Sequence, residues 1–342
     1  MIRDARVLRA GFIPQEVEHR DAEVNHLSSV LKPITSGEPA DTAVVTGPSG
    51  TGKTCVSKFV TERLREEALD VEATYVNCWR NHTRFRTLYQ ILDDIGRTID
   101  IHRQSTPHDE LIDRLQQYNE SRTVVILDEA DQLEDPSVIY DLHSLPQFAV
   151  ICIANKEEEL FGQVDDRLVS RLRSSEHVRM DKYHDEQLYD ILRARVRWGL
   201  EQDTVTDEQL YCIADAAAGD ARLAIGILRT AAGTADRENT ERITDEMLQD
   251  AAEDARAQIR QKSLDSLTPH QRVVYEIVRE HGALGPAEIH DRYTERVDEP
   301  RTKRTIRTYL SKMTQYNLLE AEGTSRDRKY TLITNGTSPS TD

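Results

Sequence analysis

The feature of this 342-residue sequence that most restricts its fold is the octapeptide GPSGTGKT, at residues 47–54. It follows an apolar run, TAVVT, and precedes CVSKFVTERLREEA, in which apolar residues recur at helical spacing. Glycines let the backbone curl so that successive N–H groups and the positive end of the following helix point at a phosphate. The lysine adds a charge for the β- and γ-phosphates, and the last threonine is placed for Mg²⁺. We expect a nucleoside triphosphate to contact Gly47, Pro48, Ser49, Gly50, Thr51, Gly52, Lys53, Thr54 and Cys55.

Two carboxylates and an amide follow other apolar runs. The segment VVILDEAD places Asp128 and Glu129 after a run long enough for a buried strand, and FAVICIANK places Asn155 after the next one. Adjacent carboxylates at a strand end point in different directions, so Asp128 suits the Mg²⁺ shell and Glu129 suits orienting a water against the γ-phosphate. The Asn155 amide suits a hydrogen bond to that phosphate or water. Acidic surface turns look similar, but the upstream loop favours the nucleotide role.

Three arginines are candidates for sensing phosphate charge. Arg167 and Arg171 lie in VDDRLVSRL, shortly before the last predicted strand, and Arg222 lies in GDARLAIGIL at a predicted helix start. A guanidinium presents planar donors that match phosphate oxygens, within the same chain or from a neighbouring subunit. Each arginine by itself is also compatible with an ordinary surface ion pair.

Apolar runs bounded by turn residues predict the strands of the first domain. Helical periodicity fills the intervals between them and indicates two helices within residues 82–120. Nearly continuous apolar strands that alternate with helices imply a parallel sheet covered on both faces. We therefore predict an α/β domain with a five-stranded parallel sheet, its strands at residues 42–46, 72–77, 123–127, 148–154 and 175–179.

From residue 183 to about residue 259 the pattern becomes purely helical, which indicates a second, all-α domain. The predicted helix stops are Gly199, Gly219 and Gly233, and the predicted caps are Thr206 and Thr244. The polar segment EDARAQIRQKSLDS is expected to be a helical or flexible linker.

Residues 265–334 are interpreted as a third domain. Thr268 and Pro269 mark a helix start and Gly282 its end, a second helix begins at Pro286, and RTKRTIRTYLSKMTQYN predicts a third. The segment LLEAEGTSRDRKYTLI predicts a closing hairpin.

In the third helix, Ile306, Leu310 and Met313 recur at helical spacing and are expected to face the core, with Tyr309 and Tyr316 beside them. Three helices and a hairpin with a basic tip describe a winged helix, whose third helix enters the major groove and whose wing contacts the DNA backbone. A solvated charged helix is the alternative. The residues expected to contact DNA are Arg301, Lys303, Arg304, Arg307, Lys312, Arg326, Arg328 and Lys329.

The charge distribution bears on the partner. The chain has 44 basic and 61 acidic residues, a net charge of −17, which by itself disfavours a polyanion. Residues 301–329, however, hold 8 basic and 3 acidic residues, and this local excess in an acidic chain favours a binding role. Elsewhere the acidic residues are spread evenly, and the chain has 35 Arg but only 9 Lys. We interpret this as the surface of a halophile's protein, whose carboxylates are screened by concentrated salt.

The order of these motifs resembles that of the AAA+ ATPases and, more narrowly, of the archaeal replication initiators related to the origin recognition complex and cell-division-cycle 6 proteins. The resemblance covers nearly the whole chain. It rests on FIPQEVEHRDAEV (12–24), GPSGTGKT (47–54), YVNC (75–78), LDEAD (127–131), IANK (153–156), DDRLVSRL (165–172), VRMDKY (178–183), GDARLAIGILR (219–229) and LTPHQRVVYEIV (267–278).

The resemblance implies roles for single residues. Asn155 matches the family's first sensor residue, and Arg222 matches the second, in a lid domain. Arg167 stands at the arginine of a motif close to D-P-R-V, in which Asp166 here replaces the proline. Arg171 is a second candidate for the arginine that reaches a neighbour's ATP.

His19 and Arg20 match a motif near the base and ribose, although from the sequence alone they would be surface residues. The implied domains are an AAA+ ATPase core at 1–182, a helical lid at 183–262 and a winged helix at 265–334, with a disordered tail at 335–342. The implied cofactors are ATP or ADP and Mg²⁺. The residues implied in hydrolysis are Lys53, Asp128, Glu129, Asn155, Arg167, Arg171 and Arg222.

The implied function is that of an initiator that binds double-stranded DNA at origin repeats, uses slow ATP hydrolysis as a conformational switch and helps to recruit the replicative helicase. Association with itself or with a paralogue on DNA is also implied. Two alternatives stay open. One is a clamp-loader-like ATPase, although such subunits lack a C-terminal winged helix. The other is an ATP-binding regulator of transcription or plasmid maintenance.

Two further expectations concern the protein's surroundings. No apolar run approaches the roughly 18 residues that cross a bilayer, and charges interrupt the start of the chain, where a signal peptide is apolar. We expect a cytoplasmic protein with no membrane partner. The four cysteines are far apart in sequence, so we expect buried thiols rather than a zinc site or disulfides.

Overall fold

The computed structural model describes residues 1–102, 106–161, 172–324 and 327–333. The chain divides into two compact units, Met1–Ala255 and Arg256–Asp342, and each has its own fold. None of the described helices combines the length and the apolar character that crossing a bilayer requires.

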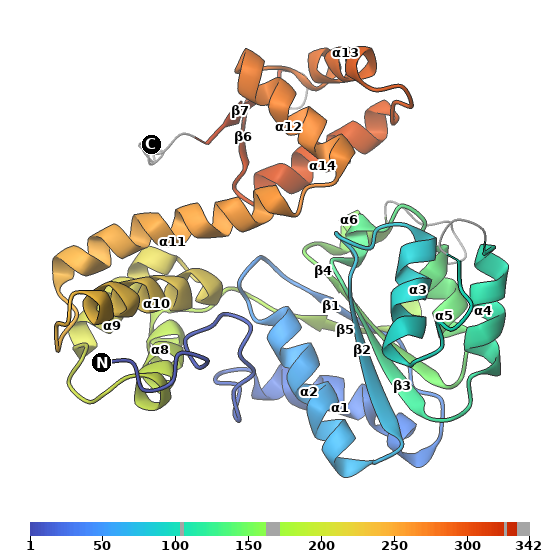
Figure 1. Ribbon diagram of the computed structural model, residues 1–342, viewed down its shortest axis with the longest axis horizontal. Helices are drawn as coiled ribbons and strands as arrows, with labels where there is room; N and C mark the ends of the chain where they lie inside the picture. Colours follow the sequence, from blue (N-terminus) through green and yellow to red (C-terminus); the bar gives the residue numbers. More distant parts are fainter. Residues whose placement is uncertain (103–105, 162–171, 325–326, 334–342) are drawn as a thin grey trace. The chain divides into compact units, whose positions relative to one another are not determined.

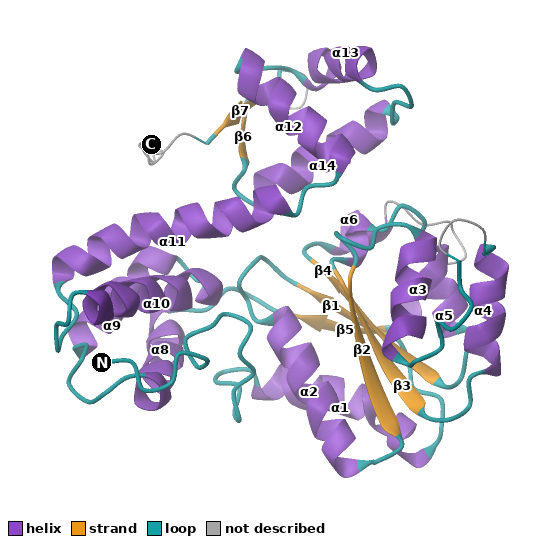
Figure 2. Cartoon of the chain, viewed as in Figure 1, coloured by secondary structure: helices purple, strands orange, loops and turns teal. Residues whose placement is uncertain are grey.

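The first unit is built on the predicted five-stranded parallel sheet, drawn in orange in Figure 2. Each predicted strand is confirmed to within one residue at either end. The order β2-β3-β4-β1-β5 places β4 between β1 and β3, so the ends of β1, β3 and β4 lie side by side at one edge of the sheet. The strands are β1 (Ala43–Thr46), β2 (Val71–Asn77), β3 (Arg122–Asp128), β4 (Phe148–Ala154) and β5 (Glu176–Arg179).

Both faces of this sheet are covered, because alternate residues of each strand point to opposite sides. Val45 and Val124 pack with the helices on one face, whereas Val44 and Val125 pack with those on the other. Figure 1 shows the two layers on either side of the sheet. The first layer holds α1 (Asp21–Leu31), η1 (Lys32–Ser36) and α2 (Lys53–Glu67); the second holds α3 (Arg84–Asp94), α4 (His108–Gln117) and α5 (Ser137–His143). Two short helices, η2 (Ala130–Gln132) and α6 (Glu157–Phe161), follow β3 and β4.

The helical part of the first unit begins after β5, as predicted. Thr206 accepts a hydrogen bond from the Gln209 N–H, and Thr244 accepts one from the Met247 N–H, so both predicted caps are confirmed. The helices are α8 (Asp185–Gly199), α9 (Asp207–Ala217), α10 (Ala221–Arg237) and α11 (Asp245–Asp265). The last helix continues beyond Ala255 into the second unit, and the segment expected to be a helical or flexible linker is helical up to Asp265.

One predicted helix stop is wrong. Gly233 lies inside α10, which continues to Arg237. Ala231, Ala232 and Ala235 are fully buried around it and are strong helix formers. One glycine costs a helix only about 1 kcal/mol, which these alanines outweigh.

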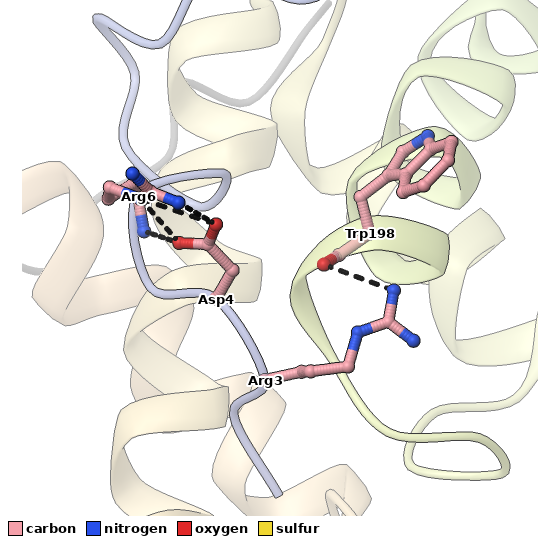
Figure 3. Close-up of polar contacts among 4 residues, drawn as sticks. All are labelled: Arg3, Asp4, Arg6 and Trp198. Carbon is pink, nitrogen blue, oxygen red and sulfur yellow. Dashed lines mark hydrogen bonds and ion pairs between the residues drawn. The ribbon is translucent and has the colours of Figure 1, made fainter.

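The first residues of the chain pack on these helices. Leu8 is 1% exposed within the helical core, and Ile2 forms an antiparallel bridge with Leu200. In Figure 3 the Arg3 guanidinium reaches the carbonyl oxygen of Trp198 at the end of α8, at 3.5 Å, while Asp4 and Arg6 pair within the segment. The division of this unit into a core at 1–182 and a lid from residue 183 stays a prediction. That division assigns the first residues to the core, whereas they pack on the helices after β5.

In the described part of the second unit, the end of α11 is followed by three helices and an antiparallel hairpin, the elements of the predicted winged helix. The Thr268 hydroxyl accepts a hydrogen bond from the Gln271 N–H at the first helix start, and Gly282 follows the end of that helix. Leu284 forms an isolated antiparallel β-bridge with Tyr330 and so lies beside the hairpin. The elements are α12 (Pro269–His281), α13 (Pro286–Arg296), α14 (Lys303–Gln315), β6 (Leu319–Glu322) and β7 (Lys329–Leu332).

Candidate functional site

The phosphate-binding loop lies between β1 and the start of α2, as the sequence predicts. Gly50 and Gly52 have φ values of +77° and +93°, which favour glycine. A Cβ on Gly47 would lie 2.1 Å from the carbonyl oxygen of Met180, and one on Gly50 would lie 2.0 Å from the Asp220 carboxylate. Only glycine therefore allows the loop to pass between its neighbours in this conformation.

The Lys53 side chain lies inside this loop. It is 9% exposed, and its Nζ donates to the carbonyl oxygens of Gly47 and Pro48 at 2.6 and 2.7 Å. It also donates to Asn155 Oδ1 at 3.1 Å, so the structure brings the predicted lysine and the predicted sensor amide together. The Thr51 hydroxyl donates to the Pro48 carbonyl and closes the loop. An ammonium group in this place is suited to phosphate oxygens.

The predicted metal-binding side chains are in direct contact. Thr54 Oγ1 donates to Asp128 Oδ2 at 2.9 Å, and Asp128 is 7% exposed. Hydroxyl and carboxylate oxygens are the ligands that Mg²⁺ prefers, so these residues fit the expected ion. Sequence reasoning gave no role to Tyr75, whose hydroxyl donates to the same Oδ2 at 2.7 Å. Burial, together with the charge of Asp128, raises the pKa of this hydroxyl, which therefore stays a donor.

Three other predicted residues flank this pair. Glu129 has a φ of +58°, a left-handed conformation that is uncommon outside glycine and common at functional sites. This conformation ends β3 immediately after Asp128. Ser49 is half-buried in the loop, and Cys55 is half-buried in the first turn of α2. Burial raises the pKa of the Cys55 thiol, so it lies near the nucleotide site as a neutral group.

The start of α10 lies against the phosphate-binding loop. The Ala221 N–H donates to the Gly50 carbonyl oxygen at 3.1 Å, and Asp220 caps α10 by accepting from the Leu223 N–H at 3.0 Å. Arg222, the predicted second sensor, is the next residue, and its side chain is exposed. The predicted Arg167 and Arg171 lie outside the described residues.

His19 and Arg20 link the end of the chain before α1 to the residues after β5. Arg20 is 6% exposed and donates to Glu23 Oε1 at 2.7 Å and to the Asp181 carbonyl oxygen at 2.6 Å. His19 Nε2 lies 2.8 Å from Asp190 Oδ2 on α8. The expectation that both are surface residues is wrong for Arg20, because its contact with the distant Asp181 cannot be read from local sequence.

The second unit presents most of its predicted basic residues to solvent. Ile306, Leu310 and Met313 are at most 1% exposed, which fixes the orientation of α14. The exposed basic residues are Arg301, Lys303, Arg304 and Arg307 at the start of α14, and Arg328 and Lys329 on the hairpin. Arg326 lies outside the described residues.

Lys312 corrects the predicted set. Its side chain is 2% exposed, and its Nζ lies 4.9 Å from the ring centroid of Tyr316, one turn further along α14. The lysine stem packs in the core while its charge meets an aromatic face. Lys312 therefore does not project outward from α14.

A buried tyrosine supports the chain where it enters α14. Tyr293 is fully buried, and its hydroxyl lies 2.6 Å from His270 Nδ1. The same oxygen accepts a hydrogen bond from the Arg301 N–H at 3.3 Å. This contact links α12 and α13 to the exposed basic segment.

Comparison with known proteins identifies the family. Residues 38–164 match the model of an AAA domain, and residues 189–253 match the model of the Cdc6 AAA+ ATPase-type lid domain. ORC1-type DNA replication protein 9 of Halobacterium salinarum is 81% identical over 340 residues, covering 99% of this chain and 96% of that protein. The chain belongs to the Orc1/Cdc6 family.

Other members of the Orc1/Cdc6 family agree with this assignment. ORC1-type DNA replication protein 1 of the same organism is 51% identical over 307 residues, which are 90% of this chain and 100% of that protein. The structure of the Aeropyrum pernix ORC1 protein in complex with DNA matches with a TM-score of 0.72 and 25% identity, over 97% of this chain and 93% of that chain. The fold is therefore that of an AAA+ Orc1/Cdc6 protein with a lid.

Proposed function

We propose that this Orc1/Cdc6 protein is a cytoplasmic, ATP-dependent replication initiator that binds double-stranded DNA at origin repeats. The names of the Halobacterium relatives support a role in replication, and the DNA in the Aeropyrum pernix structure supports a DNA partner. The proposal includes recruitment of the replicative helicase and association with itself or a paralogue on DNA.

The observation that carries the proposed switch is the hydrogen bond from the Ala221 N–H to the Gly50 carbonyl oxygen. It joins the lid helix α10 to the peptide of the phosphate-binding loop. A triphosphate in that loop would lie beside the start of α10. The Arg222 guanidinium would then interact with the γ-phosphate when it is present and lose this interaction after hydrolysis. Binding and hydrolysis would therefore shift the position of the lid. Other nucleotide switches respond in a similar way, through ordering of a segment or closure of a domain around the ligand.

The chain's own residues would divide the hydrolytic work. Lys53 would leave its carbonyl partners for phosphate oxygens, and Glu129 would orient the attacking water. Asn155, now bonded to Lys53, would contact the γ-phosphate or that water. Thr54 and Asp128 would hold Mg²⁺, which when bound neutralises charge on the β- and γ-phosphates.

We expect turnover to be slow, because a switch needs long residence in one state. In an assembly, Arg167 or Arg171 would reach the ATP of a neighbouring subunit.

The second unit would bind duplex DNA through α14 and the hairpin. Arg304 and Arg307 are exposed near the start of α14, the part of a recognition helix that reads base edges. Arg328 and Lys329 would contact phosphates as the wing. Since salt weakens phosphate contacts, binding at high salt would depend mainly on groove fit and base contacts.

Two matched variants separate the activities. Lys53→Ala should weaken ATP binding at least about tenfold by removing the phosphate-loop charge, and leave DNA binding largely intact. Lys32→Ala, the loss of an exposed lysine elsewhere in the unit, is its control. Fluorescent nucleotide binding and DNA anisotropy in the same potassium chloride buffer measure both.

Arg304→Ala with Arg307→Ala should weaken DNA binding and spare ATP binding. The control is Arg279→Ala with Arg296→Ala, which removes the same charge from α12 and α13, where both arginines pair with carboxylates. Equal losses in the two double variants would show that net charge, and not α14, governs DNA binding.

Mapping of bound DNA across the genome tests the biological role. Sites at inverted repeats beside replication start points are expected. Sites confined to promoters would contradict the initiator proposal. They would indicate a transcription regulator that uses the same two units.

A further inference from the structure

We propose that Tyr75 is a positioning residue for the metal-binding carboxylate of Asp128. The two residues come from neighbouring parallel strands, β2 and β3, in which Asn77 stands opposite Asp128. The Cys78 N–H, just beyond β2, donates to the Asp128 carbonyl oxygen at 2.8 Å and holds its backbone. Tyr75 then holds its side chain, through the 2.7 Å hydrogen bond to Oδ2.

The two donors to Asp128 share one oxygen. Thr54 Oγ1 and the Tyr75 hydroxyl both donate to Oδ2, so neither hydrogen bond uses Oδ1. The torsion of an aspartate carboxylate is broad when nothing restrains it. Two donors from different elements fix the plane of the carboxylate and the direction in which its lone pairs point.

The tyrosine ring is itself held by the phosphate-loop helix. Lys58 Nζ lies 3.7 Å from the ring centroid of Tyr75, a cation–π contact. Lys58 is one turn after Thr54 on α2. The same helix therefore supplies a hydroxyl to Asp128 directly and a cation that fixes the ring of the second donor.

This arrangement predicts an effect on the metal and not on the nucleotide alone. Partners that orient a metal-binding carboxylate typically change metal affinity by about 10–100-fold when they are removed. Tyr75→Phe keeps the ring and loses only the hydroxyl. We expect about tenfold weaker metal binding, and unchanged nucleotide affinity in the absence of metal.

The experiment uses the full chain and rests on the proposed nucleotide function. Protein loaded with AMPPNP in potassium chloride is titrated with Mn²⁺, and free Mn²⁺ is followed by electron paramagnetic resonance. Affinity for a fluorescent ATP is measured separately in EDTA. Tyr75→Leu, which also lacks the hydroxyl, is measured alongside so that the result does not depend on the folding of one variant.

Tyr118→Phe is the matched control, since the Tyr118 hydroxyl donates to a carboxylate, Glu72 Oε2, at 3.1 Å near the start of β2. It should leave Mn²⁺ affinity unchanged. In an Asp128→Asn background, Tyr75→Phe should cause no further loss of Mn²⁺ affinity.

Three results would overturn the inference: wild-type Mn²⁺ affinity in Tyr75→Phe, an equal loss of nucleotide affinity in EDTA, or a further loss in the Asp128→Asn background. If the unsubstituted protein bound no nucleotide in either condition, the proposed function would fail instead.

Discussion

At the scale of single residues, the four cysteines differ in how far they are buried. All are thiols; Cys78 and Cys152 are fully buried, Cys55 is half-buried and Cys212 is exposed. The expectation of buried thiols is therefore wrong for Cys212. Burial raises the pKa of Cys152 to about 12 and also raises the pKa of Cys78. A thiol with a raised pKa stays protonated at pH 8 and is a poor nucleophile.

These differences predict the reaction with a disulfide reagent such as DTNB. At pH 8 we expect one fast thiol per native chain, Cys212, and release of the others by denaturant. Because the two pKa shifts are upward, raising the pH from 7 to 9 should not make Cys78 or Cys152 reactive. The Cys212→Ser variant should lose the fast phase; a fast phase that survives this substitution would contradict the assignment.

At the scale of the elements, Gly50 and Gly233 lie in different surroundings. Gly50 lies in the phosphate-binding loop with a φ of +77°, and a Cβ there would meet Asp220, the cap of α10. Gly233 lies inside α10, where a Cβ would meet nothing within 4 Å. The structure therefore predicts opposite effects of alanine at the two positions.

Gly50→Ala should destabilise the first unit by about 2 kcal/mol, from backbone strain and a displaced cap, and should weaken ATP binding. Gly233→Ala should stabilise it by about 0.5–1 kcal/mol, because alanine costs less entropy in a helix. Urea denaturation and nucleotide binding measure both. Destabilisation by Gly233→Ala would mean that α10 does not continue through this residue.

The chain before α1 packs against the helical core of the first unit. Arg195 on α8 is 7% exposed and donates to the carbonyl oxygens of Val7 and Phe12 at 2.7 and 3.3 Å. A Cβ on Gly199 would lie 3.1 Å from the Leu8 side chain, so the segment packs closely. The segment is therefore part of the lid's packing.

Leu8→Ala should lower the free energy of unfolding by about 3 kcal/mol, since it removes a fully buried side chain. Leu69→Ala is the control, because Leu69 is fully exposed and its loss should change stability by less than about 0.5 kcal/mol. Thermal and urea denaturation of both variants measure the difference. Equal stability of the two variants would show that residues near Leu8 do not pack on α8.

At the scale of the whole molecule, the net charge of −17 is expected to make stability depend on salt. Like charges repel over about 10 Å at 0.1 M salt but over only about 3 Å at 1 M. We expect the melting temperature to rise between 0.1 and 2 M KCl, by about 2–4 °C for each 1 kcal/mol of repulsion removed. Chloride salts keep exclusion effects small, so that the measurement reports screening. Greatest stability in dilute buffer would contradict a halophilic surface.

The local features of the molecule follow from neighbours in the chain. The loop at 47–54, the five strands and the caps at Thr206 and Thr244 each depend on a few consecutive residues, through glycine φ values, apolar runs and side-chain caps. The same is true of the exposed arginines at the start of α14, whose direction follows from the buried stripe of that helix. Local physics therefore predicts the core of the site, including Lys53 and Asp128.

Tertiary packing decided the contacts between distant segments. Tyr75 meets Asp128 only because β2 and β3 pair in one register, and Arg20 is buried only because residues after β5 return to it. The helical spacing of Ile306, Leu310 and Met313 predicts an outward Lys312, yet the folded unit covers the stem of this lysine and places its charge against Tyr316. Side-chain burial is a property of the assembled fold, since it depends on which distant segments arrive at the same place, and local sequence carries little of that information.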